Sequence, residues 1–271
     1  MKTKTLALGV TLPLALGLLA STAVLAAEID TTRLPPKDVS FSFQGPFGTY
    51  DRGALQRGYQ VYKEVCAACH SANHLAFHNL AESGGPEFSE AQVRALAAAA
   101  KLPADPNDKG ETTDDKGAPL MRSATLADKF PAPFPNEEAA RANNGGALPP
   151  DLSMIVKARE GGPQYVYSIL TGFGATPPHG FKVMDGKYYN PYFEGWNISM
   201  PQPLRPDSVS YSDGTKASIE QEAHDVTTFL AWASEPKMEE RKRLGFGVMV
   251  FLLVLAGLLF AAYRRVWKDM H

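Results

Sequence analysis

The sequence predicts a mainly α-helical domain with long loop insertions, followed by one C-terminal transmembrane helix. Apolar residues recur at helical spacing near residues 55–66 and again at 219–233. Between these segments lie stretches rich in Pro and Gly, which is the composition of long loops. The third observation is a run without charged side chains at 244–263. At 1.5 Å per residue, a helix of that length spans the roughly 30 Å hydrocarbon core of a membrane.

The N-terminal stretch predicts a signal peptide at residues 1–27. Two lysines precede an apolar centre at 6–20, and small residues follow it. This order of charge, apolar centre and small residues is typical of secretory signal peptides. A retained membrane anchor is the alternative, and the absence of Arg from the segment disfavours a mitochondrial presequence. We expect cleavage after Ala26 or Ala27 and export of the domain at 28–236.

The first helix leads into the most informative motif of the chain. Its apolar residues, which include Leu55 and Tyr59, run directly into a pentapeptide in which Cys66 and Cys69 enclose two alanines and His70 follows. This is the attachment sequence of a c-type haem. Both thiols can add to the vinyl groups on one porphyrin edge, which places His70 as the proximal iron ligand. We therefore expect one haem c, covalently attached through Cys66 and Cys69.

The cysteine pair has two other interpretations, a redox dithiol and half of a zinc site. A zinc site needs two more cysteines or a spaced histidine pair, and the chain has only two cysteines. A thioredoxin-like dithiol lies at the start of a helix in a βαβ unit, which the surrounding sequence does not predict. His74 and His78 are one helical turn apart, but no acidic ligand accompanies them. We expect them to be surface histidines or neighbours of the haem.

The middle of the chain alternates short helices with loops. Residues 90–101 are rich in alanine and have high helix propensity. Asp151 is a predicted N-cap for a helix at 152–159, and a glycine pair followed by proline separates this helix from another at 164–171. Loops as long as the remaining ones are usually functional or disordered in a compact domain. These loops cover 102–135 and 174–206.

The last helix of the exported domain has clear start and stop signals. Ser218 and Gln221 form a capping-box pattern, an apolar stripe follows along 219–233, and Pro236 lies beyond the end. His224 falls off that stripe, so we expect it to be solvated. Packed together, the first and last helices can close a haem pocket.

The C-terminal region predicts a basic juxtamembrane segment at 237–243, a transmembrane helix at 244–263 and a tail at 264–271. Both flanks of the apolar run carry Lys and Arg, so the positive-inside rule gives no orientation. The export signal does: the haem domain lies on the periplasmic side of a bacterial inner membrane, and the tail lies in the cytoplasm. A buried core helix is the alternative, which these charged flanks disfavour.

The sixth iron ligand separates two functional classes. A thioether ligand raises the reduction potential and closes the iron to small molecules, which suits electron transfer, whereas an open site suits an anchored haem enzyme or gas sensor. Met200 is the favoured ligand because two prolines follow it closely and stiffen its loop. A methionine that fills a core gap is the alternative at each position. The other methionines outside the terminal and membrane-associated segments are Met121, Met154 and Met184.

The exported domain is acidic. Residues 28–236 contain 18 Lys plus Arg against 26 Asp plus Glu, a net charge of −8, although the whole chain carries only −2. Such a field attracts a cationic partner, and we expect no nucleic-acid partner. Ordinary solvated loop surface is the alternative for each acidic cluster. The clusters are Asp105, Asp108, Glu111, Asp114 and Asp115, and then Glu137 and Glu138.

An ordered set of motifs resembles the cytochrome c1 family, which supplies the haem subunit of the cytochrome bc1 complex. The resemblance runs nearly end to end and is far more specific than the haem motif alone. The matching segments are 47–51, 55–66, 69–71, 147–153, 158–162, 170–172, 188–193, 200–201, 235–236 and 240–243, with Tyr165.

The resemblance implies a cytochrome c-type haem domain with Met200 as sixth ligand. It implies that Arg159 meets a haem propionate and that Tyr165, Pro149 and Pro150 line the haem pocket. It also implies an electron-transfer subunit that is not an enzyme on its own. Electrons would come from a Rieske iron–sulfur protein and leave to a soluble c-type cytochrome, and cytochrome b would hold the anchor.

The sequence departs from the family pattern at three places. Phe77 and His78 stand where the family usually has Tyr and Arg, so a permanent positive charge is replaced by a histidine. The extra disulfide of some bacterial relatives is absent, because Cys66 and Cys69 are the only cysteines. Two glycines, at 145 and 146, stand where one is common.

Overall fold

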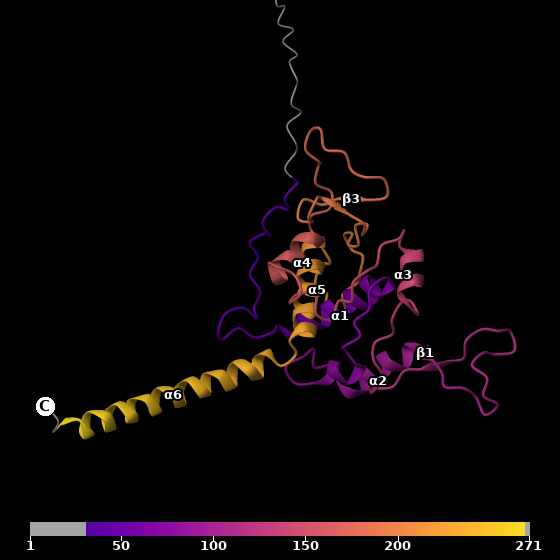
Figure 1. The fold of residues 1–271 in the computed structure, drawn as a ribbon. Coiled ribbons are helices and arrows are strands. Elements are labelled where there is room, and N and C mark those ends of the chain that lie inside the picture. Colours follow the sequence, from indigo (N-terminus) through magenta and orange to yellow (C-terminus); the bar gives the residue numbers. More distant parts are fainter. Residues whose placement is uncertain (1–30, 269–271) are drawn as a thin grey trace, which may run out of the picture. The chain divides into compact units, whose positions relative to one another are not determined.

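The structure is a computed structural model that describes residues 31–268. The predicted signal peptide and the final residues of the predicted tail lie outside that range. Helices predominate among the described residues, as predicted (Figure 1). The elements are α1 Arg52–Glu64, η1 Cys66–Ala68, η2 Phe77–Ala81, α2 Glu90–Ala99, β1 Lys101–Pro103, β2 Met121–Ser123, α3 Glu137–Asn143, α4 Gly162–Leu170, β3 Tyr188–Tyr189, β4 Asn197–Ile198, α5 Ile219–Ser234 and α6 Met238–Val266, where η marks a 3₁₀-helix.

Helices α1 and α5 pack against each other at the centre of the helical domain (Figure 1). Helix α1 begins where the Asp51 carboxylate accepts a hydrogen bond from the Ala54 N–H at 3.1 Å. Gly58 lies at the helix crossing, and a Cβ atom on it would stand 2.1 Å from the carbonyl oxygen of Asp225. Glycine at this position therefore permits the close approach that buries the apolar face of α1.

Helix α5 is capped as predicted but is buried more completely than one apolar stripe implies. The Ser218 hydroxyl accepts the Gln221 N–H at 3.2 Å. Every residue of α5 beyond Gln221 is buried except His224, which is half-buried. Our expectation that His224 is solvated is wrong. Its ring stacks on Phe41 with the centroids 4.8 Å apart, because the segment before α1 covers this side of α5.

Short antiparallel hairpins close the two long loops. Strands β1 and β2 pair Leu102 with Arg122, and β3 and β4 pair Tyr188 with Ile198. From within β2, Arg122 donates two hydrogen bonds to the Asp128 carboxylate, at 2.7 and 2.6 Å. The loop-like composition therefore correctly predicts that neither segment forms a long helix or strand. It misses the hairpins, because their paired residues lie far apart in the sequence.

One other local prediction is wrong. Residues 152–159 form successive turns rather than a helix, and Asp151 accepts hydrogen bonds from another segment instead of capping one. For Glu137 and Glu138 the loop-surface alternative does not apply, because they lie in the first turn of α3, which Asn136 caps by accepting the Ala139 N–H at 2.8 Å. Negative charge in the first turn of a helix is favourable, so these two glutamates support α3.

Helix α6 contains both the predicted apolar run and nearly all of the basic segment before it. It runs unbroken over Met238–Val266, and only Met238 among its residues is buried. Within residues 31–268 it is the one helix long and apolar enough to cross a membrane. The fold is therefore a helix-rich domain with one long apolar C-terminal helix that fits a single membrane anchor, as the sequence predicts.

Candidate functional site

The cysteine motif forms a tight turn at the end of α1. Residues Cys66–Ala68 make the 3₁₀-turn η1, and the N–H groups of Cys69 and His70 both donate to the carbonyl oxygen of Cys66, at 3.1 and 2.9 Å. Two thiols are thereby held about one turn apart, with the imidazole next to them. This is the local geometry that double thioether attachment to a porphyrin requires.

The His70 ring is oriented by a backbone contact from a distant segment. Its Nδ1 atom lies 2.8 Å from the carbonyl oxygen of Pro150, so Nδ1 carries the proton that it donates, and Nε2 keeps a free lone pair. Burial lowers the pKa of His70 below its ordinary value, although the Pro150 contact and Asp151 oppose this. A neutral ring with Nε2 available is what axial ligation of iron needs.

Asp151 ties that distant segment to the cysteine motif. Its carboxylate accepts the Ser71 hydroxyl at 2.7 Å and the Asn73 N–H at 2.9 Å, and its other oxygen accepts the Ser153 N–H at 2.8 Å. The Leu152 N–H also donates to the Ser71 carbonyl oxygen at 2.8 Å. Although burial raises the pKa of Asp151, these hydrogen bonds outweigh burial and lower the pKa below its ordinary value.

The sequence does not predict this role of Asp151. Its short polar side chain after two prolines is equally typical of a helix cap and of a turn. The partners that decide between the two, Ser71 and Asn73, are far away in the sequence. The turn dipeptide before Asp151 was the available signal, and it indicates only that the chain reverses there.

The properties of Cys66 argue against dithiol chemistry. Burial, followed by the neighbouring Cys69, raises the pKa of the Cys66 thiol to about 12. Reactive cysteines have lowered pKa values instead, since the thiolate is the nucleophile. Residues 31–268 also contain no group of three or more His, Cys, Asp or Glu side chains that could hold a metal ion. Within this part of the chain, a zinc site therefore lacks the ligands it would need.

The residues at the motif fit a covalently held haem. Two thiols and an imidazole with a free nitrogen are the donor set of such a group. Tyr62 lies one turn before Cys66 on α1, and its hydroxyl is buried without a hydrogen-bond partner among the described residues. The Tyr62 ring packs against Phe130 and Phe229, so an aromatic cluster lies beside the end of α1 that carries the motif.

The structure brings together only part of the predicted site. Pro150 contacts His70 directly, and Pro149 precedes it in the same turn. Met200 is half-buried just after β4, and the pKa of Tyr165 is raised by burial, an effect that the nearby charge of Arg159 opposes. Arg159 is exposed and donates to the carbonyl oxygen of Ala158 at 3.3 Å. Among the hydrogen bonds of residues 31–268, none joins Met200, Arg159 or Tyr165 to the cysteine motif.

His74 and His78 lie on the surface, and Phe77, which departs from the family pattern together with His78, lies in the core. His74 and His78 are exposed, and the His78 Nε2 atom lies 3.6 Å from a Glu82 carboxylate oxygen. Phe77 is buried, with its ring centroid 5.1 Å from that of Phe130. The substitution of Tyr-Arg by Phe-His thus leaves an aromatic ring in the core and places the polar residue in solvent.

A cysteine turn with an oriented histidine, in a helical domain joined to one apolar helix, is the architecture of a membrane-anchored c-type cytochrome. A sequence model of the Cytochrome C1 family matches residues 41–270. The chain belongs to this family, which confirms the resemblance inferred from its motifs.

Curated relatives cover most of the chain. It is 48% identical to the Bradyrhizobium diazoefficiens protein named cytochrome b/c1, over 95% of this chain and 40% of that protein. It is 47% identical to the mitochondrial cytochrome c1 heme protein of Kluyveromyces lactis, over 85% of this chain and 75% of that one. For cytochrome c1 of Rhodospirillum rubrum, the identity is 43% over 85% of this chain and 86% of that one. The chain thus spans less than half of the Bradyrhizobium protein.

Proposed function

We propose that the chain holds one haem c through Cys66 and Cys69, with His70 and Met200 as axial ligands, and passes single electrons beside a membrane. When bound, this group supplies a one-electron couple whose potential its axial ligands set. The contact between the His70 Nδ1 atom and the Pro150 carbonyl oxygen carries the proposal. It fixes the imidazole in the tautomer that leaves Nε2 for iron. A redox dithiol does not need such a ligand, and the described residues lack the further ligands of a zinc site.

The loop around Met200 suits a weak thioether ligand. Lys187 from the paired segment donates to the Ser199 hydroxyl at 2.6 Å, and the Gln202 amide donates to the Leu204 carbonyl oxygen at 3.0 Å. Pro201 and Pro203 further limit the conformations of the chain. Met200 is therefore held in a loop that loses little entropy when its sulfur binds. Arg159 is proposed to meet a propionate, and Tyr165 to line the pocket beside it.

The proposed electron route follows the family resemblance. Electrons arrive from a Rieske iron–sulfur protein and leave to a soluble c-type cytochrome, within a quinol–cytochrome c oxidoreductase. The chain acts there as an electron-transfer subunit and is not an enzyme on its own. We place the haem domain on the periplasmic side of a bacterial inner membrane, with α6 as the single-pass anchor. The acidic surface of the domain supports a cationic electron acceptor.

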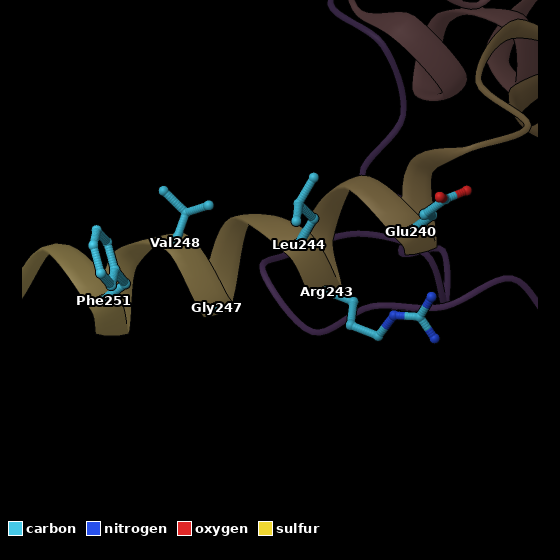
Figure 2. A pocket seen from close by; sticks show the side chains of 6 residues that line it. All are labelled: Glu240, Arg243, Leu244, Gly247, Val248 and Phe251. Carbon is cyan, nitrogen blue, oxygen red and sulfur yellow. The ribbon is translucent and has the colours of Figure 1, made fainter.

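We propose cytochrome b as the partner that holds α6, and the helix itself suggests which face it uses. One side of α6 carries a shallow groove of about 460 Å³, which Figure 2 shows with Gly247 between apolar side chains. Lys242, which bonds the segment before α1, belongs to the opposite side of the helix. The groove face is therefore left for another protein. Its residues are Glu240, Arg243, Leu244, Gly247, Val248 and Phe251.

The replacement Met200→Leu tests the axial ligand. We expect the reduction potential to fall by on the order of 0.1 V, within the roughly 0.8 V over which axial ligands set haem potentials. The reduced variant should also bind carbon monoxide, because the thioether no longer closes the iron. Met184→Leu is the matched control, since Met184 is an exposed methionine. A high potential retained by Met200→Leu, without carbon monoxide binding, would contradict the assignment.

The competing function is an anchored haem enzyme or gas sensor with an open sixth position. The test is carbon monoxide binding to the reduced wild-type protein. Electron transfer through a closed site predicts none, whereas rapid binding would favour the enzyme or sensor.

A further inference from the structure

The segment just before α1 ends in an exposed aromatic tip that the function proposed above does not use. Phe47 is 78% exposed, although its neighbours Phe43 and Tyr50 are buried. Hydrogen bonds within the segment hold its backbone in place. The Gln44 N–H donates to the carbonyl oxygen of Phe41, and the Thr49 N–H donates to that of Ser42, both at 3.1 Å. Phe47 is therefore held outward by a fixed loop, residues 41–50, which we call the aromatic loop.

The aromatic loop is fastened to the start of α6. The Lys242 ammonium donates to the carbonyl oxygens of Phe43 and Gly48, at 2.7 and 2.9 Å. The Glu239 carboxylate accepts the N–H of Tyr50 at 2.7 Å and a guanidinium N–H of Arg52 at 2.8 Å. Figure 2 shows this segment passing alongside the start of α6. These hydrogen bonds fix the position of the loop along α6.

The aromatic loop lies level with the start of the apolar run of α6. The Phe47 ring meets Phe246 edge to face, with centroids 6.1 Å apart, and Phe246 is the third residue of the charge-free stretch that starts at Leu244. At the opposite end of α6, the exposed Tyr263 and Trp267 rings pair at 6.1 Å. Aromatic side chains gather at both interfaces of a bilayer. The start of α6 has neither Tyr nor Trp.

We propose that the aromatic loop is a membrane-interface site in which Phe47 inserts into the bilayer beside α6. An exposed aromatic ring at the edge of an apolar helix gains free energy by leaving water, as aromatic residues of interfacial helices do. Basic residues precede the apolar run, and Arg243, directly before Leu244, can attract anionic lipid headgroups. The loop therefore gives the domain a second contact with the membrane, which fixes its tilt relative to the anchor.

A nitroxide spin label at position 47 tests the proposal. The variant Phe47→Cys is made in the full chain, haem-loaded and assembled in its complex, in nanodiscs of phosphatidylcholine with phosphatidylglycerol. Within this chain the label reacts with the introduced thiol alone, because the native cysteines form thioethers, and this point rests on the proposed function. The wild-type complex treated with the same reagent gives the background from thiols of other subunits. Oxygen, which partitions into lipid, and a water-soluble nickel chelate are then added to separate samples, and the relaxation that each adds is measured against a sample without it, in which any effect of the haem iron is the same.

We expect oxygen to relax the label at position 47 severalfold more than the nickel chelate does. Leu252→Cys within α6 gives the lipid reference, and Lys109→Cys in the exposed hairpin loop gives the aqueous one. A nickel response at position 47 equal to that at position 109 would overturn the proposal. A label shielded from both reagents would overturn it too, because a protein partner would then cover Phe47. The haem spectrum of each variant reports separately on attachment, so failure of the proposed function is recognised independently.

Discussion

At the scale of single residues, hydrogen bonds between distant segments determine how the candidate haem site is built. Cys66, Cys69 and His70 are recognisable because the chemistry acts between near neighbours in the chain. The Pro150 carbonyl that orients His70, and the Asp151 carboxylate beside it, come from a segment some eighty residues away. No local pattern encodes such a contact, so the sequence predicts His70 as a candidate ligand but not the groups that orient it.

Asp151→Ala measures how much this support contributes. The substitution leaves three donors without their acceptor: the Ser71 hydroxyl and the N–H groups of Asn73 and Ser153. An unsatisfied buried donor costs about 1–3 kcal/mol, and partial access of water reduces the total. We expect a loss of about 2–4 kcal/mol in the free energy of unfolding, measured by denaturant titration of the haem-loaded protein. Asp115→Ala, on an exposed loop, should change it by less than about 0.5 kcal/mol.

Glu222 on α5 makes stability depend on pH. It is fully buried, and burial raises its pKa above 4.5, although hydrogen bonds from Ser208 and Val209 oppose the shift. A carboxyl with a raised folded-state pKa binds its proton more tightly in the folded state. Its contribution is therefore greatest below the unfolded-state pKa and is lost as pH rises to the folded-state value.

We expect wild-type stability relative to Glu222→Gln to fall as pH rises from about 4.5 towards neutrality, because the glutamine cannot ionise. Thermal unfolding across this range measures the difference. Glu220→Gln, at an exposed position of the same helix, is the control. A wild-type advantage that stays constant or grows with pH would contradict the assignment.

At the scale of secondary-structure elements, prediction succeeded where a helix has its own capping signals. Helix α5 begins at the predicted Ser218 cap, and α1 leads into the cysteine turn as its periodicity indicates. The helix predicted at 152–159 is absent because the hydrogen bonds of Asp151 draw the chain into turns. Helix α3 was missed because it is short and rich in charge, and such a segment reads as loop surface.

The groove on α6 can be tested by filling it. A Cβ atom on Gly247 meets nothing within 4 Å in this chain, and neither does one on Gly245. Leucine at either position is therefore compatible with the haem domain and the helix. We expect Gly247→Leu to reduce co-purification of cytochrome b in detergent severalfold, because it occupies the groove. Gly245→Leu, outside the groove lining, should retain it. Equal retention by both variants would exclude the groove as the contact.

At the scale of the whole molecule, one of the two acidic clusters is joined to the candidate haem site by a short segment of chain. The turn after α3 is well ordered: the Gly146 N–H donates to the Arg141 carbonyl oxygen at 2.8 Å, and the Asn144 amide donates to that of Ala140 at 2.7 Å. This turn leads directly into Pro149 and Pro150, which adjoin His70. Helix α3 is thus linked to the site by a short ordered segment, whereas the other acidic cluster lies in the loop between β1 and β2.

We therefore predict that α3 is the acidic surface that steers a cationic soluble cytochrome. The double variant Glu137→Gln/Glu138→Gln should lower the second-order rate of electron transfer severalfold at low salt, since exposed charges interact over a Debye length of about 10 Å at 0.1 M. Asp108→Asn/Asp115→Asn removes the same charge from the hairpin loop and should have the smaller effect. Stopped-flow rates measured across ionic strength should converge for all three proteins at high salt, where screening removes the steering. A rate that does not change with salt would show that neither cluster guides the encounter, and a larger loss in the hairpin variant would move the docking surface there.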